Sequence, residues 1–380
     1  MNKHDLTRNY WMLDGPFAKK GYDWWWHNFT GINEETGEEK TFFIEYFTCD
    51  PAIANERDGG QTPTLGQDPL NKEKGFRPSY LMIKCGWWGK DAVQLHRFIP
   101  WKDVSIKNNK TGFQLTALDC SASDTRLTGN VQINDSANHP EWMCGDGSMQ
   151  WDLSIKKDVA FNVGYGAGKL FRDLKAFEMY WHAEGMKSFY EGSVSANGKK
   201  YKIIKEKSFG YADKNWGSNF TSPWVWLSSN DLVSKISGKK LENSVFDIGG
   251  GCPKVFGLSL KRKLLSDFWY EGKSYEFNFS KFWTFCRTKF DCKETEEKII
   301  WYVRQETRKA VMETQMECPK SQMLLVNYES PDGAKRHTRL WNGGTGYGTI
   351  KLYKKTHHKL ELLDEVEANH LGCEWGEYEN

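Results

Sequence analysis

The sequence contains no C-x-x-C pair, and its 9 cysteines follow no repeating spacing along 380 residues. An odd number of scattered cysteines in a chain of this length indicates reduced, buried thiols and a cytoplasmic location, not a disulfide framework. A structural zinc site is also disfavoured, because such sites take ligands from closely spaced pairs. We therefore expect no metal.

Long apolar runs and an excess of charge are missing as well. The first residues, MNKHDLTRNYW, lack the apolar region of a signal peptide, and no stretch reaches the roughly 18 apolar residues of a membrane-spanning helix. The net charge is only +2, with no basic stripe of the kind that nucleic-acid-binding proteins show. These absences predict no nucleic-acid partner and no stable membrane insertion.

Several catalytic motifs are absent too. The sequence has neither the G-x-S-x-G motif of serine hydrolases nor the H-E-x-x-H motif of zinc proteases. The glycine-rich segment from Gly164 to Lys169 lacks the spacing and the terminal Ser or Thr of a phosphate-binding loop. Nucleotide chemistry is therefore not expected.

Aromatic residues and short strand-like runs are abundant. The runs alternate apolar with polar residues and are separated by Gly, Asn, Asp and Ser, which is typical of antiparallel strands with one face on a core. Hairpin turns are predicted at Asn197-Gly198 and Asp332-Gly333, and residues 50–78 are predicted to be a long loop. The sequence thus predicts an all-β protein, with strand-like runs that begin at Lys40, Ser79, Gly112, Tyr201, Lys254, Lys273, Lys298 and Thr349.

Two domains are predicted from the chain length and from a faint internal repeat. A chain of 380 residues is long for a single core. NVGYGAGKLFR around Gly164 and TGYGTIKLYK around Gly346 share Gly-Tyr-Gly followed by Lys-Leu and an aromatic residue. We predict the join near Glu184, which gives domains of residues 1–184 and 185–380.

One segment, GYADKNWGSNFTSPWVW at residues 210–226, sets the carboxyl group of Asp213 among aromatic residues. On an extended strand, alternation places Tyr211 and Asp213 on one face and Lys214 on the other. An acid in such surroundings is either a structural carboxylate, held by backbone groups or by Lys214, or a proton donor whose pKa is raised by burial.

This segment resembles the signature of the tocopherol cyclase family, an aromatic residue, a spacer, an acid, Lys-Asn-Trp-Gly and a W-x-W. The resemblance continues in YWHAEGMKSFYEGSV around His182, in FDIGGGCP around Gly250 and in WNGGTGYGTIKLY around Gly343. It implies the fold of that family and of the related carotenoid hydratases, which is two lipocalin-like antiparallel β-barrels in tandem. One position departs from the plant enzymes, where the acid is Glu and not Asp.

The resemblance implies an enzyme that cyclises a prenylated quinol and needs no cofactor. Asp213 would protonate an alkene of the isoprenoid chain, and the phenol oxygen would close the ring in an intramolecular isomerisation. Tyr211 would orient the acid. His182 would act as a base toward the phenol proton, or it is a structural histidine at the domain seam. The expected partner is an apolar small molecule, which could reach the protein from a membrane.

Tryptophan faces would stabilise the cation that protonation creates, because an aromatic face attracts positive charge. Consecutive residues of a strand alternate between its faces, so in GYDWWWHNF Trp24 and Trp26 are predicted to point together and Trp25 to point away. The predicted substrate-binding residues are Trp24, Trp26, Trp181, Trp216, Trp224 and Trp226.

Two alternatives remain open at the level of the sequence. The first is a barrel that binds an isoprenoid or another lipid without catalysis. The second is a carbohydrate-binding or carbohydrate-active β-protein, because exposed tryptophans also stack on sugars. A glycosidase would need two carboxyl groups about 5 to 10 Å apart, and the signature supplies one acid.

Overall fold

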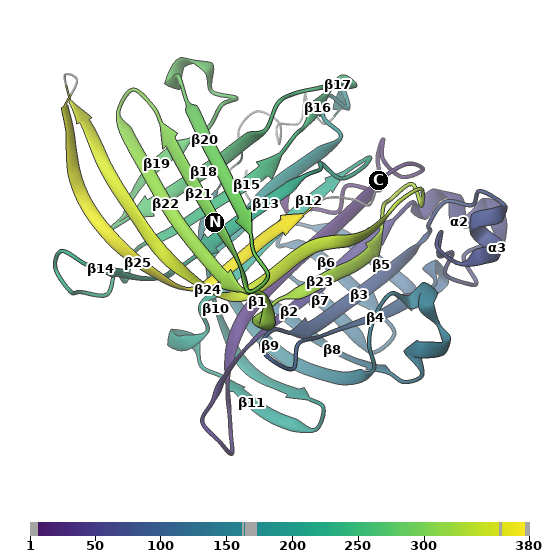
Figure 1. Cartoon of the computed structure of the whole chain (residues 1–380). Coiled ribbons are helices and arrows are strands. Elements are labelled where there is room, and N and C mark those ends of the chain that lie inside the picture. The colour runs from purple at the N-terminus through teal and green to yellow at the C-terminus, as the bar shows by residue number, and fades with distance from the viewer. Residues whose placement is uncertain (1–6, 162, 164–172, 357–358, 377–380) are drawn as a thin grey trace.

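The computed structural model describes residues 7–161, 163, 173–356 and 359–376. Within these ranges the chain is nearly all β, and its antiparallel strands form two large curled sheets. Figure 1 shows the sheets side by side, the first in purple to teal and the second in green to yellow. The predicted fold class, two tandem antiparallel barrels, is confirmed.

The first sheet has 12 strands in the described part of the chain and curls until β4 contacts β8 and β9. Most neighbours in this sheet are also neighbours in sequence, but β12 pairs with both β1 and β10 and so lies between them. The strands are β1 (Tyr22–Asn33), β2 (Glu39–Cys49), β3 (Tyr80–Trp87), β4 (Val93–Ile99), β5 (Val104–Asn109), β6 (Gly112–Ala117), β7 (Cys120–Ser123), β8 (Arg126–Ile133), β9 (Gly147–Phe161), β10 (Met179–Ala196), β11 (Lys199–Ile203) and β12 (Gly210–Gly217).

The second sheet, 11 strands over the described residues, is closed partly by Gln305, whose side chain donates to the Leu264 carbonyl over 3.2 Å. A separate two-stranded hairpin is made of β16 (Lys254–Val255) and β17 (Leu258–Ser259). The strands of the sheet are β13 (Trp224–Ser229), β14 (Asp231–Ser234), β15 (Val245–Gly251), β18 (Lys263–Tyr270), β19 (Lys273–Phe277), β20 (Arg287–Glu294), β21 (Lys298–Glu306), β22 (Ala310–Pro319), β23 (Leu324–Glu329), β24 (Arg336–Thr356) and β25 (Lys359–Gly376).

The two hairpin predictions are confirmed, and the loop prediction needs a correction. Turns at Asn197-Gly198 and Asp332-Gly333 connect β10 to β11 and β23 to β24. Segment 50–78 contains two short helices, α2 (Pro51–Arg57) and α3 (Pro69–Glu73). Each begins with a proline after an aspartate, a favoured start for a helix, which the sequence analysis did not use. No helix in the described ranges is both long and apolar enough to cross a membrane.

The change from one sheet to the other comes between Gly217 and Trp224, whereas the predicted join at Glu184 lies inside β10. The first sheet therefore extends further along the chain than the predicted first domain. Whether either sheet is an independent folding unit stays a prediction. The first copy of the faint repeat lies mostly outside the described residues, and the second lies within β24.

The two sheets meet along a seam of side chains and not only through the connecting segment. Strands β23 and β24 lie against β2 and β4. Trp88 Nε1 donates to Asn342 Oδ1 over 2.7 Å, and Gln94 Nε2 donates to the Leu325 carbonyl over 2.8 Å. Trp25 points the other way into the core of the first barrel, where its ring stacks on Phe113 at 4.3 Å between centroids.

Candidate functional site

A cavity of about 40 Å³ lies at the seam, with walls from both sheets. The first sheet contributes Trp24 and Trp26, which point together as their alternation with Trp25 predicts, and the second contributes Trp224 and Trp226. Polar groups share these walls with the tryptophans. The lining residues are Trp24, Trp26, Glu45, Lys84, Met179, Asp213, Phe220, Thr221, Trp224, Trp226, Val326, Tyr328, His337, Leu340 and Glu374.

Asp213 reaches this cavity because of its place on β12. It lies opposite Trp26 of β1, and strand alternation turns the next residue, Lys214, to the other face. Lys214 forms a buried ion pair with Asp23 there. The structural reading in which Lys214 neutralises Asp213 is therefore wrong, and the acid is left without that cation.

The two oxygens of Asp213 have different surroundings. Oδ2 accepts hydrogen bonds from Trp181 Nε1 at 2.9 Å and from the Tyr211 hydroxyl at 3.2 Å. Oδ1 is buried and has no hydrogen-bond partner among the described residues. Burial raises the pKa of Asp213 to about 8, and the charge of Glu374 adds to this shift, while the two hydrogen bonds oppose it. In the neutral acid, Oδ2 is then the carbonyl oxygen and Oδ1 carries the proton.

A second carboxyl group, that of Asp247 on β15, contacts the Tyr211 hydroxyl. It was not among the residues predicted from the sequence. Its Oδ2 lies 3.2 Å from the Tyr211 hydroxyl, and its Oδ1 accepts from Trp226 Nε1 at 3.1 Å. Burial, and then the charge of Asp213, raises its pKa well above the usual value. A protonated Asp247 can donate to Tyr211, which donates in turn to Asp213. The only sequence signal was its place just before the glycine triplet in FDIGGGCP.

A third carboxyl group, Glu374 of β25, lines the cavity from the second sheet. It accepts from Trp224 Nε1 at 2.7 Å and from Asn342 Nδ2 at 2.5 Å. Burial raises its pKa to about 6, while the hydrogen bond from Asn342, the charge of Lys84 and the hydrogen bond from Trp224 oppose the shift. Nothing in the sequence around Glu374 marked it as a site residue.

Glycines make room for the indoles that hold these acids. A Cβ added at Gly249 would lie 2.9 Å from the ring of Trp181, and one at Gly372 would lie 2.2 Å from the ring of Trp226. Both distances are too short for a stable contact, so the rings occupy their places only because these residues are glycines. One member of the predicted glycine triplet thus supports the donor to Asp213.

Two of the predicted site residues face away from the cavity. Trp216 is buried on the face of β12 that carries Lys214, and its ring stacks on Tyr180 at 5.6 Å. His182 lies opposite Lys214 on β10 and is fully buried. Burial, with the charges of Arg8 and Lys157, lowers its pKa to about 3. The structure therefore does not bring His182 or Trp216 to Asp213.

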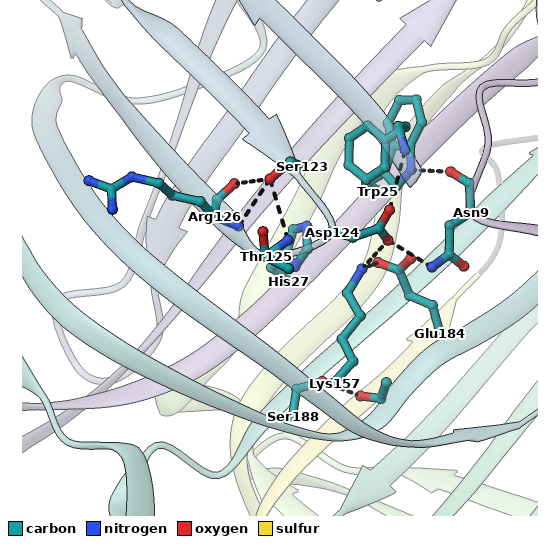
Figure 2. Close-up of polar contacts among 12 residues, drawn as sticks. Asn9, Trp25, His27, Ser123, Asp124, Thr125, Arg126, Lys157, Glu184 and Ser188 are labelled. Atoms are coloured by element: carbon teal, nitrogen blue, oxygen red, sulfur yellow. Dashed lines mark hydrogen bonds and ion pairs between the residues drawn. The ribbon is translucent and has the colours of Figure 1, made fainter. Parts of the chain in front are cut away.

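The face that carries His182 belongs to a charged cluster inside the first barrel. Figure 2 shows Lys157 between Asp124 and Glu184. Its Nζ lies 3.0 Å from Asp124 Oδ1 and 2.7 Å from Glu184 Oε1. Burial raises the pKa of Glu184 to about 7. Asn9 also donates to Asp124 over 2.8 Å. Since Lys157 forms ion pairs with two buried carboxyl groups that do not line the seam cavity, we interpret the cluster as structural.

No group of three or more His, Cys, Asp or Glu side chains in the described part of the chain is arranged to hold a metal ion. Comparison with protein families gives one match, to the family described as tocopherol cyclase-like, over residues 23–377. Comparison with curated proteins gives no match.

Solved structures with a similar overall arrangement include two with low sequence identity. One is a kievitone hydratase from Nectria haematococca, at 12% identity and a TM-score of 0.46, covering 96% of this chain and 91% of that one. The other is CghA with Sch210972, at 9% identity and a TM-score of 0.43, covering 94% of this chain and 89% of that one. Likenesses this distant say nothing about the reaction.

Proposed function

The chain belongs to the tocopherol cyclase-like family, and we propose that it is an enzyme in which Asp213 protonates an alkene of a prenylated quinol and the phenol oxygen then closes a ring. One observation carries this proposal above the others. Asp213 lies in a wall of the seam cavity, and two donors bind one of its oxygens while the other has no hydrogen-bond partner among the described residues.

The geometry suits a general acid. With a pKa of about 8, Asp213 holds its proton at neutral pH, and none of the residues that the structure describes accepts the proton on Oδ1. After transfer, the negative charge is shared with Oδ2, where Trp181 and Tyr211 already donate. These two bonds strengthen when the carboxylate forms, so they stabilise the product of proton transfer more than the neutral acid.

The tryptophans supply what the other product, a tertiary carbocation, requires. Trp24, Trp26 and Trp226 line the same cavity as Asp213, where an aromatic face can stabilise a cation. The phenol oxygen attacks the cation and loses its proton to a carboxylate of the cavity, which leaves substrate and product isomeric. One proton is added at carbon and one is released from oxygen, so no added reactant is consumed.

The placement of the aromatic rings also favours this reading over a sugar platform. Trp26 is 7% exposed and Trp226 is 3% exposed, whereas stacking on an oligosaccharide requires an open ring face. Trp24 and Trp224 are partly buried and turned toward the cavity.

The test is turnover of a prenylated hydroquinone in heavy water. The wild-type protein should form a chromanol with one non-exchangeable deuterium on the carbon that receives the proton. Asp213→Asn should keep the fold, because the amide oxygen can accept the same two bonds, and should lower turnover by about a hundredfold or more.

Asp267→Asn is the matched control, since Asp267 is a buried acid in the same half of the chain that bonds to Ser274 and lies outside the cavity wall. That variant should retain turnover. Normal turnover by Asp213→Asn would show that the mechanism is wrong. A wild-type protein that binds the quinol without converting it would support the non-catalytic alternative.

A further inference from the structure

A second cavity of about 80 Å³ adjoins the first and is mostly apolar. Its walls come from β10, from β15 and β18 of the second sheet, and from the segment after β12. Trp181, the donor to Asp213, is also a lining residue of this second cavity. Other lining residues that matter below are Leu265 of β18 and Phe279.

Trp224 separates the two cavities. It lines both, together with the smaller side chains of Met179 and Thr221. Its ring meets that of Trp181 edge to face at 6.4 Å. Trp224 is only partly buried, so part of its side chain already meets solvent.

The volumes indicate that this separation must open for a ring-containing ligand. A cavity of about 150 Å³ accommodates benzene, and each cavity here is smaller, at about 40 and 80 Å³. Displacement of the Trp224 indole would join the two spaces and add the volume of the indole itself. The joined space would be polar at the Asp213 and Glu374 end and apolar at the Leu265 end.

Displacement of Trp224 has a second consequence, at Glu374. The indole N–H donates to Glu374 Oε2 over 2.7 Å, and that bond is lost when the ring moves. A carboxylate oxygen left without its donor in a closed site is costly. A ligand that places a hydroxyl group there restores the bond.

We propose that the ligand takes the place of the Trp224 indole, with a ring hydroxyl donating to Glu374, its ring in the space between the cavities, and an apolar chain in the second cavity. The inference rests on the proposed function for its ligand class, a ring with a hydroxyl group and a long apolar chain. Glu374 thereby becomes the residue that selects the hydroxyl group. Leu265, in the wall of the second cavity, contacts the apolar chain and limits its size.

The test uses binding of a hydroquinone that carries a saturated isoprenoid chain, followed by calorimetry. Without a double bond the probe cannot be protonated, so its binding is separate from the proposed chemistry. The wild-type protein should prefer it to its dimethyl ether by about ten- to a hundredfold, the range for a hydrogen bond to a charged group. Glu374→Gln should lose most of this preference.

Two further variants test the positions of ring and chain. Trp224→Ala should bind the saturated-chain hydroquinone and its dimethyl ether several-fold more tightly than the wild type does, because no indole has to move before binding. Leu265→Phe should weaken binding of the hydroquinone that carries the chain. It should leave binding of a second probe, a hydroquinone without the chain, unchanged. Trp224→Phe, which keeps a ring but breaks no hydrogen bond on moving, should tighten binding less than Trp224→Ala.

The proposal is overturned if Glu374→Gln keeps the preference for the free hydroxyl group, or if Leu265→Phe weakens both hydroquinones equally. Thermal melting identifies any variant that fails to fold, and if Trp224→Ala does so, Trp224→Phe replaces it in the comparison. Tight binding of the saturated probe with no conversion of its unsaturated counterpart would refute the proposed function and leave this inference standing.

Discussion

The indole nitrogen of Trp181 donates to Oδ2 of Asp213 over 2.9 Å, from one strand of the first sheet to its neighbour. The same type of pair occurs twice more at the seam, from Trp226 to Asp247 and from Trp224 to Glu374. An indole holds a carboxyl oxygen in place without bringing a positive charge. Its hydrogen bond lowers the pKa of Asp213, but burial raises that pKa more.

Two buried acids inside the first barrel have charged partners instead. Asp23 is paired with Lys214, and Asp124 with Lys157. Burial raises the pKa of Asp23 too, but Lys214 opposes the shift and the pKa is about 6, compared with about 8 for Asp213. Asp213 thus differs from Asp23 in accepting from neutral donors where Asp23 is paired with a lysine.

The first prediction concerns the pH dependence of stability. The pKa of Asp213 is raised from 3.8 to about 8 on folding, so the folded state binds this proton more tightly than the unfolded state. The resulting stabilisation is complete below the unfolded pKa and is lost as the pH rises toward about 8. Asp213→Asn cannot lose a proton, so its free energy of unfolding should fall less than that of the wild type across this range.

Urea denaturation at a series of pH values measures the difference. Asp152→Asn, a change at an exposed acid paired with Arg126, should leave the wild-type pH dependence intact. Parallel curves for the wild type and Asp213→Asn would mean that Asp213 does not keep its proton in the folded protein.

The second prediction concerns the donors to Asp213. The hydrogen bonds from Trp181 and Tyr211 both lower its pKa, because they favour the charged form. Trp181→Phe and Tyr211→Phe should therefore each shift the basic limb of the pH–turnover profile upward. Each should cost less turnover than Asp213→Asn, since the proton source stays in place. Trp216→Phe, on the other face of β12, should leave the limb where it is, and a downward shift in either donor variant would contradict the assignment.

The fold could be predicted from the sequence because its signals are local. Alternation along GYDWWWHNF placed Trp24 and Trp26 on one face and Trp25 on the other, and the same rule separated Asp213 from Lys214. Each prediction needed only the period of a strand. The join was harder to locate, because β10 pairs with β12 across the predicted boundary at Glu184, and pairing between strands is not visible in one strand's pattern.

Among the acids of the site, only the one on the first sheet was predictable. Asp213 and Tyr211 are neighbours on one strand, so their shared face follows from spacing. Asp247 and Glu374 come from strands of the second sheet, and they reach the seam through the packing of one barrel on the other. His182 was misplaced for a related reason, since being next to Trp181 in sequence puts it on the opposite face of β10.

The third prediction concerns Gly249. A Cβ there would lie 2.9 Å from the Trp181 ring, so Gly249→Ala should displace the indole from Asp213 and reduce stability by about 1–3 kcal/mol. Its pH–turnover profile should shift upward like that of Trp181→Phe. In the double variant Gly249→Ala with Trp181→Phe, the smaller ring relieves the contact. The double variant should therefore lose less stability than the two single variants lose in sum.

Gly145→Ala is the matched control, because the nearest atom to its added Cβ is 3.9 Å away. It should be close to neutral in stability and leave the pH profile unchanged. Strict additivity in the double variant would show that Gly249 does not support the Trp181 ring.

The fourth prediction concerns a contact between the sheets at His370 of β25. Its Nδ1 lies 2.7 Å from Asp231 Oδ2 in the second sheet, and its Nε2 lies 3.0 Å from Glu39 Oε2 in the first. Burial lowers the pKa of His370, but the hydrogen bonds and charges of the two acids outweigh it and the net shift is upward from 6.5. The protonated imidazole therefore joins the two sheets.

Because this pKa is raised on folding, the contact stabilises the protein fully below the unfolded pKa of 6.5 and is lost as the pH rises through the folded pKa. His370→Asn suits the left-handed backbone here, where φ is +47°, and should lower the free energy of unfolding at acidic pH by up to about 1 kcal/mol. The deficit should shrink at alkaline pH. Glu39→Gln should show part of the same deficit. A deficit that is constant with pH would indicate that the His370 contact does not depend on its charge.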